Sequence, residues 1–506
     1  MSERTSEHVD IAIIGTGFGG LGAAIRLKQE GIEDFVVFER ADAVGGTWHV
    51  NTYPGAQCDI PSALYSFSFA PNPDWTRLYP LQPEIEAYLN DCTDRLGVRR
   101  HIRFGHDVQD ASWDDDARLW SVTTSNGHWT ARVLIGALGP FSEAATPDIA
   151  GLETFAGNVF HSADWDHEAE LAGRIAVIGT GASAVQFIPQ IAPEAEHLTL
   201  FQRTPTWIMP HPDRPVHARV RNLFRRVPRT QRALRKQFDL VQDAFVPGLV
   251  RWNRLLAPAA ALGRVHLRRQ VGDPELRKKL TPDYAFGCKR PTFSNKYYPA
   301  LTRPNVTVET AAINSVRPEG IETADGVVHE VDTIVLGTGF TVSRHSGFRR
   351  IRGRGGVSLA ETWPNGEMAS YRGTTVHGFP NFFMILGPNS VVYTSQVVTI
   401  EAQVEHILAA LRVLSTRKDS AIEVKASAQQ EFCSMVDRKL AGSVWNSGGC
   451  SSYYLSPSGR NVTFWPGSVR SFTRAMSRVE LSDYIFYPAV APATTTGPAL
   501  EEVVTQ

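Results

Sequence analysis

The 506-residue sequence has few cysteines, and their spacing lacks the patterns of common metal and redox sites. The five cysteines include no C-x-x-C or C-x-x-x-x-C pair; they are Cys58, Cys92, Cys288, Cys433 and Cys450. This spacing excludes zinc ribbons and similar metal centres. We therefore predict no metal site and five reduced thiols, as in a cytosolic protein.

The sequence also lacks an excess of charge of one sign and long apolar runs. The formal net charge is −1, which argues against a nucleic-acid-binding chain. The start, MSERTSEHVD, has no apolar core of a signal peptide, and no uncharged run reaches the length of a membrane span. With 42% hydrophobic and 20% charged residues, the composition is that of a globular protein of about three domains. We predict a cytoplasmic location.

What the sequence does contain is a dinucleotide-binding fingerprint between residues 9 and 40. An apolar run ends in a G-x-G-x-x-G turn formed by Gly15, Gly17 and Gly20, and a helical pattern follows. The glycines allow a tight turn and close approach to a pyrophosphate, which the helix N-terminus attracts. A second apolar run leads to Glu39, a carboxylate placed to accept hydrogen bonds from ribose hydroxyls. The segment predicts a strand–helix–strand unit that binds an adenine dinucleotide.

A second motif of the same kind lies between residues 174 and 204. An apolar run is followed by a G-x-G-x-x-A turn formed by Gly179, Gly181 and Ala184. The acid expected at the end of the next strand is missing, and Gln202, Arg203 and Thr204 stand there instead. Because an arginine pairs with a ribose 2′-phosphate that a carboxylate would repel, this site suits NADPH, whereas the first suits FAD or NAD. Two such sites predict electron transfer between cofactors.

Two further segments are ambiguous when only their chemistry is considered. Residues 45–59 mix glycine, proline and aromatic residues, as in a rigid loop, and end at Asp59. Asp59 is a candidate charged group of a cofactor site, but a lone loop aspartate is more often a turn or helix-cap residue. His161 and Trp165, before the second unit, are explained by packing between domains. Chemistry alone favours the structural explanation for both segments.

Together, these segments resemble the type I Baeyer–Villiger monooxygenases. The connector Phe155-x-Gly157-x-x-x-His161-x-x-x-Trp165-Asp166 is similar to the family signature F-x-G-x-x-x-H-x-x-x-W-[PD]. The loop Gly45-Gly46-x-Trp48, continued by Tyr53-Pro54-Gly55 and Asp59, is similar to a second signature. The resemblance covers residues 9–480 and implies an α/β fold with two Rossmann-like dinucleotide-binding domains. It implies an FAD domain of residues 1–141 and 375–506, an NADPH domain of residues 142–212 and 285–374, and a helical insert of residues 213–284.

The resemblance also implies a catalytic arginine. Residues 286–291 are similar to the family's Lys-Arg segment, which places Arg290 over the flavin and Lys289 at the NADPH 2′-phosphate. Without the family, this pair is an ordinary exposed one. Reduced flavin adds O2 to form a C4a-peroxyflavin, and ester formation needs the peroxide as an anion. A permanent guanidinium, oriented by Asp59, favours that anion and the developing alkoxide. The implied reaction is the insertion of one oxygen atom into a ketone to give an ester or lactone.

The motifs and the resemblance together imply the cofactor contacts. Around FAD they imply Gly15, Gly17, Phe18, Gly20, Glu39, Gly46, Thr47, Trp48, Asp59, Ile60, Tyr65, Val108 and Asn389. Around NADPH they imply Gly179, Thr180, Gly181, Ala182, Ser183, Ala184, Arg203, Thr204, Lys289 and Trp445. Trp445 corresponds to a mobile tryptophan of the family, with a packed core residue as the equal alternative. Residues 387–390 are expected to bring a helix N-terminus against the flavin.

The segment 213–284 differs from the rest of the chain in charge. It contains 17 Lys/Arg and six Asp/Glu, a net charge of +11, which leaves about −12 for the remainder. Prolines divide it, and apolar residues recur every three or four positions from Phe238 to Trp252, as on amphipathic helices. A solvated face over a core is the usual explanation, and peripheral contact with a membrane is the alternative. The final twenty residues, rich in Ala, Pro and Thr, are predicted to be disordered.

Other functions agree less well with the sequence. An N- or S-oxygenating flavin monooxygenase shares the two Rossmann motifs but departs from the connector signature. A pyridine-nucleotide disulfide reductase needs a closely spaced cysteine pair, which is absent. A non-catalytic redox sensor would bind both nucleotides but would not need Arg290. The ketone and the oligomeric state, monomer or homodimer, are left open by the sequence.

Overall fold

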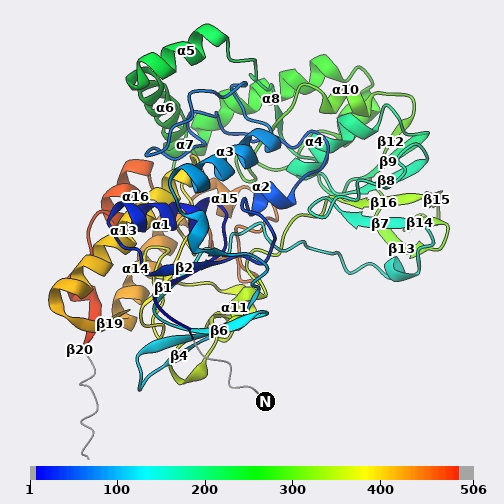
Figure 1. Ribbon diagram of the computed structural model, residues 1–506. Coiled ribbons are helices and arrows are strands. Elements are labelled where there is room, and N and C mark those ends of the chain that lie inside the picture. Colours follow the sequence, from blue (N-terminus) through cyan, green and yellow to red (C-terminus); the bar gives the residue numbers. More distant parts are fainter. Residues whose placement is uncertain (1–6, 489–506) are drawn as a thin grey trace, which may run out of the picture.

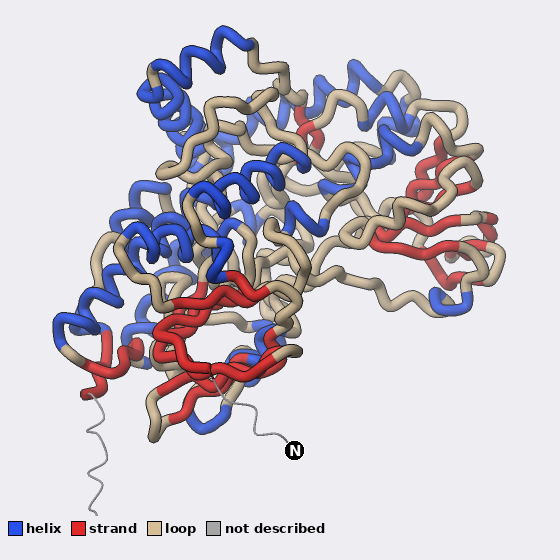
Figure 2. Tube along the Cα trace, viewed as in Figure 1, coloured by secondary structure: helices blue, strands red, loops and turns tan. Residues whose placement is uncertain are grey.

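The computed structural model describes residues 7–488, which form two separate large sheets flanked by helices (Figures 1 and 2). The predicted disorder of the last twenty residues falls almost entirely outside this range. The first of the two sheets is mixed, because β5 (Leu119–Thr124) runs antiparallel to both of its neighbours, and the second is parallel. The first sheet is built around β1 (Glu7–Ile14), whose Ile11 lies opposite Phe35 of β2 (Phe35–Phe38) and Val133 of β6 (Gly127–Gly136), all in parallel. All four residues of β2 are buried, as in a central strand.

The remaining strands extend this sheet on both sides. They are β3 (Ile102–Arg103), β4 (Val108–Asp114), β5 (Leu119–Thr124), β17 (Ile351–Arg352) and β18 (Phe382–Met384), in the order β17-β4-β5-β6-β1-β2-β3 with β18 on β6. Helices cover the sheet: α1 (Phe18–Gln29), α2 (Thr47–Val50), α3 (Gln82–Arg95), α13 (Gln396–Arg417), α14 (Ala426–Leu440), α15 (Val444–Ser447) and α16 (Val469–Met476). Apolar faces of α1, α3 and α13 bury Leu21, Leu89 and Ile407 in one core. This sheet therefore carries the first glycine-rich turn.

The second sheet carries the second glycine-rich turn and is wholly parallel. Its order is β12-β9-β8-β16-β7, from β7 (Asn158–His161), β8 (Arg174–Ile178), β9 (His197–Phe201), β12 (Val306–Glu309) and β16 (Thr333–Leu336). The helices α4 (Ala182–Ile191) and α10 (Tyr297–Leu301) pack on it. The α/β class with two Rossmann-like units is thus confirmed.

Shorter elements complete the described chain. The small sheets consist of β10 (Ile208–Met209) with β11 (Thr292–Phe293), β13 (Ile313–Arg317) with β14 (Gly320–Thr323) and β15 (Val328–Glu330), and β19 (Asp419–Val424) with β20 (Tyr484–Pro488). The short helices are α11 (Gly347–Arg350) and α12 (Leu359–Thr362). Two connections pass between the large sheets, and they pair through a bridge between Ala144 and Phe340.

The basic segment is helical, as predicted. It contains α5 (Ala218–Arg226), α6 (Pro228–Asp243), α7 (Val246–Val250), α8 (Ala257–Gln270) and α9 (Pro274–Lys279). The expected apolar stripe over a core is only partly correct, because Leu249 is buried whereas Val241 and Trp252 are 53% and 56% exposed. The chain bends after Asp243, so the stripe is not one helix face. No helix of the described chain is long and apolar enough to cross a membrane.

The expected helix N-terminus at residues 387–390 is wrong. This segment is a loop, in which Asn389 has a positive φ of 57°, and the helix α13 begins only at Gln396. The helix begins there because Ser395 caps it, accepting a hydrogen bond from the Val397 backbone N–H. The domain boundaries proposed from the sequence stay a prediction.

Candidate active site

The first glycine-rich turn leaves no room for side chains. Gly15 has a φ of +95°, and a Cβ placed there would lie 2.7 Å from the Ala137 carbonyl oxygen. A Cβ on Gly20 would lie 1.8 Å from the Gly15 oxygen, so the helix packs directly on the turn. Gly17 is the N-cap of α1 and supplies no side-chain cap, so the first backbone N–H groups of the helix are open to a ligand. The turn therefore fits a pyrophosphate.

The loop after β2 packs against this turn, and its aromatic residues lie beside the turn. A Cβ on Gly46 would lie 2.9 Å from the Gly17 Cα. Thr47 and Trp48 then begin α2, and the Trp48 Nε1–H donates to the Tyr65 hydroxyl over 2.9 Å. The Tyr65 ring meets Phe18 edge-on, with centroids 5.0 Å apart. Residues that are up to 50 positions apart in sequence thus form one wall beside the turn.

Glu39 lies at the end of β2, as its spacing predicted, and it is buried. Its Oε2 accepts hydrogen bonds from the Thr16 backbone N–H and hydroxyl over 2.9 and 2.6 Å, and its Oε1 accepts from the Ala41 N–H over 2.9 Å. These bonds fix the carboxylate beside the glycine turn. Val108, also expected at this site, is buried at the start of β4.

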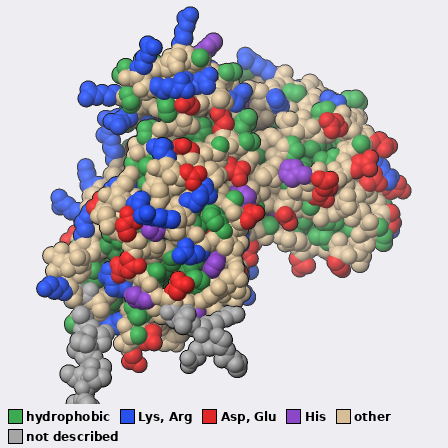
Figure 3. Space-filling model, viewed as in Figure 1, with side chains coloured by type: hydrophobic (Ala, Val, Ile, Leu, Met, Phe, Trp, Pro, Cys, Tyr) green, Lys and Arg blue, Asp and Glu red, His purple; other side chains and the backbone are tan. Residues whose placement is uncertain are grey.

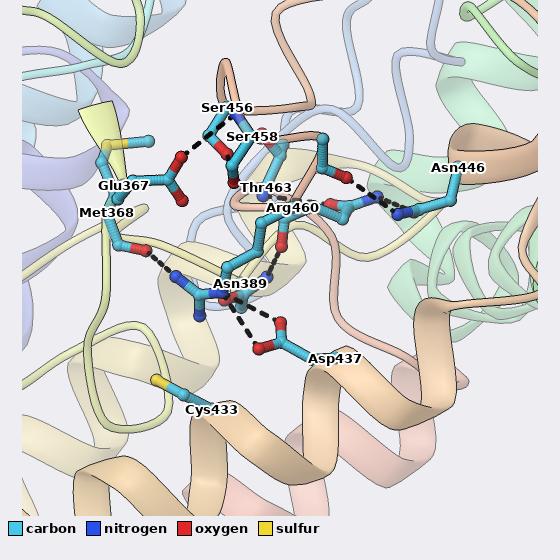
Figure 4. A network of polar contacts seen from close by, with 12 residues as sticks. Glu367, Met368, Asn389, Cys433, Asp437, Asn446, Ser456, Ser458, Arg460 and Thr463 are labelled. Atoms are coloured by element: carbon cyan, nitrogen blue, oxygen red, sulfur yellow. Dashed lines mark hydrogen bonds and ion pairs between the residues drawn. The ribbon is translucent and has the colours of Figure 1, made fainter. Parts of the chain in front are cut away.

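Asn389 belongs to a network of polar contacts that also contains Arg460 and Asp437 (Figure 4). Its Nδ2 donates to the carbonyl oxygens of Asn461 and Phe464, and its buried Oδ1 has no partner within the described chain. Arg460 completes the network by donating to Asp437 and to the Met368 carbonyl oxygen. An acceptor held rigidly without a donor is expected where a ligand donates.

The second turn repeats the first in its geometry. Gly179 has a φ of +110°, and a Cβ placed there would lie 2.4 Å from the Gly337 oxygen at the exit of β16. Gly181 is the uncapped N-cap of α4, whose first turn is formed by Ala182, Ser183 and Ala184. The Thr180 hydroxyl donates to the Thr204 carbonyl oxygen over 2.7 Å. The turn is therefore joined to the segment of Gln202, Arg203 and Thr204, which stands where the acid is expected.

Two cations converge at this second turn. Lys289 is half-buried, and its pKa is lowered by burial and by the positive charge of Arg203, against a smaller opposing effect of Asp283. Arg203 itself is exposed. Two neighbouring cations repel each other, so they are stabilised by an anion bound between them. This arrangement fits a phosphate group.

Arg290 forms an ion pair with Asp59, as the resemblance implied. Its Nε donates to the Asp59 Oδ2 over 2.6 Å, and the two side chains are 36% and 32% exposed. Burial acts to lower the pKa of Arg290, but the charge of Asp59 and neighbouring tyrosines outweigh it and raise the pKa above its ordinary value. Asp59 therefore makes a long-range ion pair that a turn or helix-cap role does not require, and its place in a cofactor site stays a prediction.

Three tyrosines around this pair were not found from the sequence. The Arg290 guanidinium lies 5.8 Å from the ring centre of Tyr393, and the Arg290 backbone N–H donates to the Tyr454 hydroxyl over 3.2 Å. Tyr453 packs edge-on against Tyr454. These residues follow Arg290 by more than 100 positions, and only the adjacent Tyr453-Tyr454 pair is a local signal.

The prediction of five reduced thiols is wrong for Cys288 and Cys450, which form a disulfide with Cα atoms 6.1 Å apart. The bond joins the Arg290 loop to the loop after Trp445, across 162 positions of sequence. Spacing rules find cysteine pairs that are local, and this pair is created by the fold. Cys58, Cys92 and Cys433 are free thiols.

The remaining expected residues occupy packed positions. Trp445 is buried and stacks on Phe464 with centroids 3.8 Å apart, which is the alternative that the sequence left open. Trp165 is buried against Phe187, and His161 accepts a hydrogen bond at Nδ1 from the Ala163 N–H. Packing thus accounts for the connector, as its chemistry alone suggested. Ile60 is buried next to Asp59.

Comparison with known proteins agrees with this geometry. Residues 12–244 match a family model described as pyridine nucleotide-disulphide oxidoreductase. A Baeyer–Villiger monooxygenase of Streptomyces coelicolor is 46% identical over 97% of this chain and 95% of its own length, and one of Pseudomonas aeruginosa is 45% identical over 94% and 90%. The closed crystal structure of cyclohexanone monooxygenase superposes with a TM-score of 0.85 at 33% identity, covering 96% of this chain and all of that one.

A steroid monooxygenase structure bound to NADP superposes with a TM-score of 0.84 at 31% identity, over 95% of this chain and all of that one. The two glycine-rich turns and the similarity over nearly the whole chain therefore indicate the same family. The chain belongs to the Baeyer–Villiger monooxygenases, the family of flavin enzymes that its connector and loop signatures resemble.

Proposed function

We propose that the protein binds FAD and NADPH and inserts one oxygen atom of O2 into a ketone, giving an ester or a lactone. The observation that carries the proposal is the Arg290–Asp59 ion pair, which joins the loop after β2 to the loop before β11. Family membership gives the class of enzyme, and this pair is the group in the described chain that suits the insertion step.

The first turn supports FAD at the first sheet. The uncapped N-terminus of α1 would hold the pyrophosphate, and Glu39 would accept hydrogen bonds from ribose hydroxyls. The aromatic side chains of Phe18, Trp48 and Tyr65 and the unpartnered Oδ1 of Asn389 would suit the flavin ring of FAD. When bound, FAD accepts a hydride from NADPH and supplies the chemistry that activates O2.

The second turn supports NADPH. The uncapped N-terminus of α4 suits the pyrophosphate, and Lys289 and Arg203 suit the ribose 2′-phosphate. An acid at the end of β9 would repel this phosphate, and Gln202 stands there instead. These residues would therefore select NADPH over NADH.

Arg290 suits an oxygen-insertion step because negative charge develops on the ketone oxygen as the carbonyl is attacked. A guanidinium beside that oxygen stabilises the charge, and it keeps its own proton at any pH at which the protein is folded. Asp59 fixes its orientation through the Nε hydrogen bond, and Tyr454 fixes its backbone. The chain thus supplies a permanent positive charge rather than a general acid.

The test is to follow NADPH oxidation by the purified flavoprotein over a panel of cyclic, linear and steroid ketones and to identify products by mass. We expect consumption of NADPH coupled to a product heavier than the ketone by one oxygen atom. Oxidation of amines or sulfides with no ester from any ketone would instead indicate an N- or S-oxygenating enzyme. The cytoplasmic location and the oligomeric state, monomer or homodimer, stay predictions.

A further inference from the structure

Exposed apolar side chains are concentrated in the basic insert. Of the 18 large hydrophobic residues that are exposed in the described chain, ten lie between Val220 and Val265. The same stretch lies within the segment of net charge +11. Lys and Arg gather over α5 and α6 at the top of the molecule, whereas Asp and Glu gather over the second sheet (Figure 3). Apolar and cationic groups therefore share one protruding surface.

We define the basic hairpin as α5 and α6, Ala218–Asp243. It contains eight Lys/Arg and two Asp/Glu, a net charge of +6. The helix α5 buries none of its residues. At about 100° per residue, its apolar side chains at positions 220, 223 and 224, with Val227 just after it, lie within an arc of about 100°, and its arginines lie on both flanks of this arc and on the far side. This apolar face is only partly covered within the described chain, because Phe224 is half-buried whereas Val220, Leu223 and Val227 are exposed.

The other helix of the hairpin is fixed to the body of the protein. Arg235 donates to the carbonyl oxygens of Leu64 and Ser66 and pairs with Glu401. The two acidic residues also face inward, because Asp239 accepts from the Thr394 hydroxyl and Asp243 accepts from the Val469 N–H. The hairpin is therefore a rigidly presented surface whose outward charges are all positive.

The outward cations have few partners. Among the described ion pairs, Arg225 contacts Asp74, and no ion pair is formed by Arg219, Arg226, Arg229, Arg232 or Lys236. Unpaired cations beside an exposed apolar arc are typical of helices that lie in the interface of a lipid membrane. Val220, Leu223 and Val227 are 39%, 46% and 43% exposed, so each has apolar surface left to bury.

We propose that the basic hairpin docks on an anionic membrane surface, with the apolar arc of α5 entering the headgroup region and the arginines facing the lipid phosphates. A second copy of the chain is disfavoured because like charges would face each other. A nucleic acid would match the charge but not the aliphatic side chains Val220, Leu223 and Val227. This surface lies outside the glycine turns and the Arg290 pair, so the inference does not depend on the proposed reaction.

The test is cosedimentation of the full-length flavoprotein with vesicles of equimolar phosphatidylglycerol and phosphatidylcholine, compared with pure phosphatidylcholine. We expect binding to the anionic vesicles that weakens with added salt, and little binding to the neutral ones. Each removed cation weakens such binding about fivefold, and each Glu also adds a negative charge, so Arg226→Glu, Arg229→Glu and Arg232→Glu together should weaken it by roughly a hundredfold or more. Val220→Ser, Leu223→Ser and Val227→Ser together should weaken it about tenfold or more.

The matched control is Val327→Ser with Val357→Ser, two valines outside the insert that are 49% and 47% exposed and that should leave binding unchanged. A variant is used only if its thermal unfolding midpoint equals that of the parent protein. If the triple Ser variant fails to fold, the triple Glu variant still tests the proposal. Equal binding to neutral vesicles, or no binding to either, would overturn the proposal. It would also be overturned by duplex DNA binding without vesicle binding, or by dimers that the apolar substitutions abolish.

Discussion

A single side chain, Arg290, connects the geometry of the site to its chemistry. Its charge is half-shielded from solvent and is balanced by one carboxylate, Asp59, at 2.6 Å. A lysine at this position would lose its proton more readily when desolvated, whereas a guanidinium stays charged. The position therefore requires arginine and not merely a cation.

This requirement gives the first prediction. Arg290→Lys should lower ester formation about a hundredfold or more, because removing a group that stabilises developing oxyanion charge has effects of this size. NADPH oxidation should continue and yield hydrogen peroxide, since the glycine turns are untouched. The measurement is ester by mass alongside peroxide and NADPH. Arg132→Lys, which alters an ion pair with Asp10 on the first sheet, is the matched control and should leave coupling unchanged. Undiminished ester from the Arg290 variant would contradict the assignment.

The second prediction concerns Lys289 and pH. Burial and Arg203 lower the pKa of Lys289, so the free enzyme should lose this positive charge at a pH below that of an ordinary lysine. Because the cation binds the 2′-phosphate, kcat/KM for NADPH should fall as pH rises through this pKa. NADH lacks that phosphate, so its profile should not show the fall. Lys289→Met should lower kcat/KM for NADPH roughly 10- to 100-fold and remove the alkaline decline. Identical profiles for NADPH and NADH would exclude this role.

Single residues also show which parts of the candidate site could be predicted from the sequence and which could not. Gly15, Glu39 and Gly179 were predictable because their positions are set by local strand–turn–helix geometry. Asp59 and Arg290 were found only through the resemblance, since 231 positions separate them and no spacing rule joins them. Tyr393 carries no local pattern, Tyr454 is marked only by its neighbour Tyr453, and the fold brings both to the site.

At the scale of elements, two segments are joined to each other near the Arg290–Asp59 pair. The loop of residues 284–290 and the segment of residues 443–450, which contains α15, are joined by the Cys288–Cys450 disulfide. The Ala285 N–H also donates to the Gly448 carbonyl oxygen over 2.9 Å. A Cβ on Gly448 would lie 2.7 Å from the Cβ of Cys288. The Arg290 loop is therefore held in place by a partner that the strand and helix patterns did not reveal.

The third prediction tests this connection. Denatured, unreduced protein should show three reactive thiols, and reduction should raise the number to five, because only Cys58, Cys92 and Cys433 are free. Cys450→Ser should lower the free energy of unfolding by about 2–4 kcal/mol, since the bond closes a long loop of the unfolded chain. Thiol titration and chemical denaturation provide the measurements. Cys433→Ser, which removes a free thiol, is the control with a small effect, and five thiols before reduction would show that the bond is absent.

At the scale of the whole molecule, the sequence predicted the two Rossmann-like units correctly. The runs that became β1, β2, β8 and β9 are buried parallel strands, for which apolar periodicity is a strong signal. The loop at residues 387–390 was predicted less well, because its structure depends on the core that it packs against. The exposure of the apolar face of the insert was likewise not predictable, since periodicity shows that a helix is amphipathic but not what covers it.

The last prediction concerns acid stability, to which several buried histidines contribute. His406 of α13 is fully buried, and burial lowers its pKa to about 4, against a partly opposing hydrogen bond with the Met476 carbonyl oxygen. Burial also lowers the pKa of His101, His161, His211 and His345. Between the folded and unfolded pKa values the unfolded chain binds more protons, so stability is complete above about pH 6.5 and falls as pH falls toward 4.

For His406 alone, the shift from an ordinary value near 6.5 to about 4 corresponds to a loss of about 3 kcal/mol over this interval. His406→Asn keeps a donor for the Met476 carbonyl oxygen but cannot take up a proton. The free energy of unfolding of this variant, measured by urea denaturation from pH 7 to pH 4, should therefore depend less steeply on pH than that of the parent protein. His8→Asn, at an exposed position, should leave the slope unchanged. Equal slopes for His406→Asn and the parent would mean that the imidazole is not kept neutral by burial, and acid sensitivity would then have to arise from the carboxylate ion pairs instead.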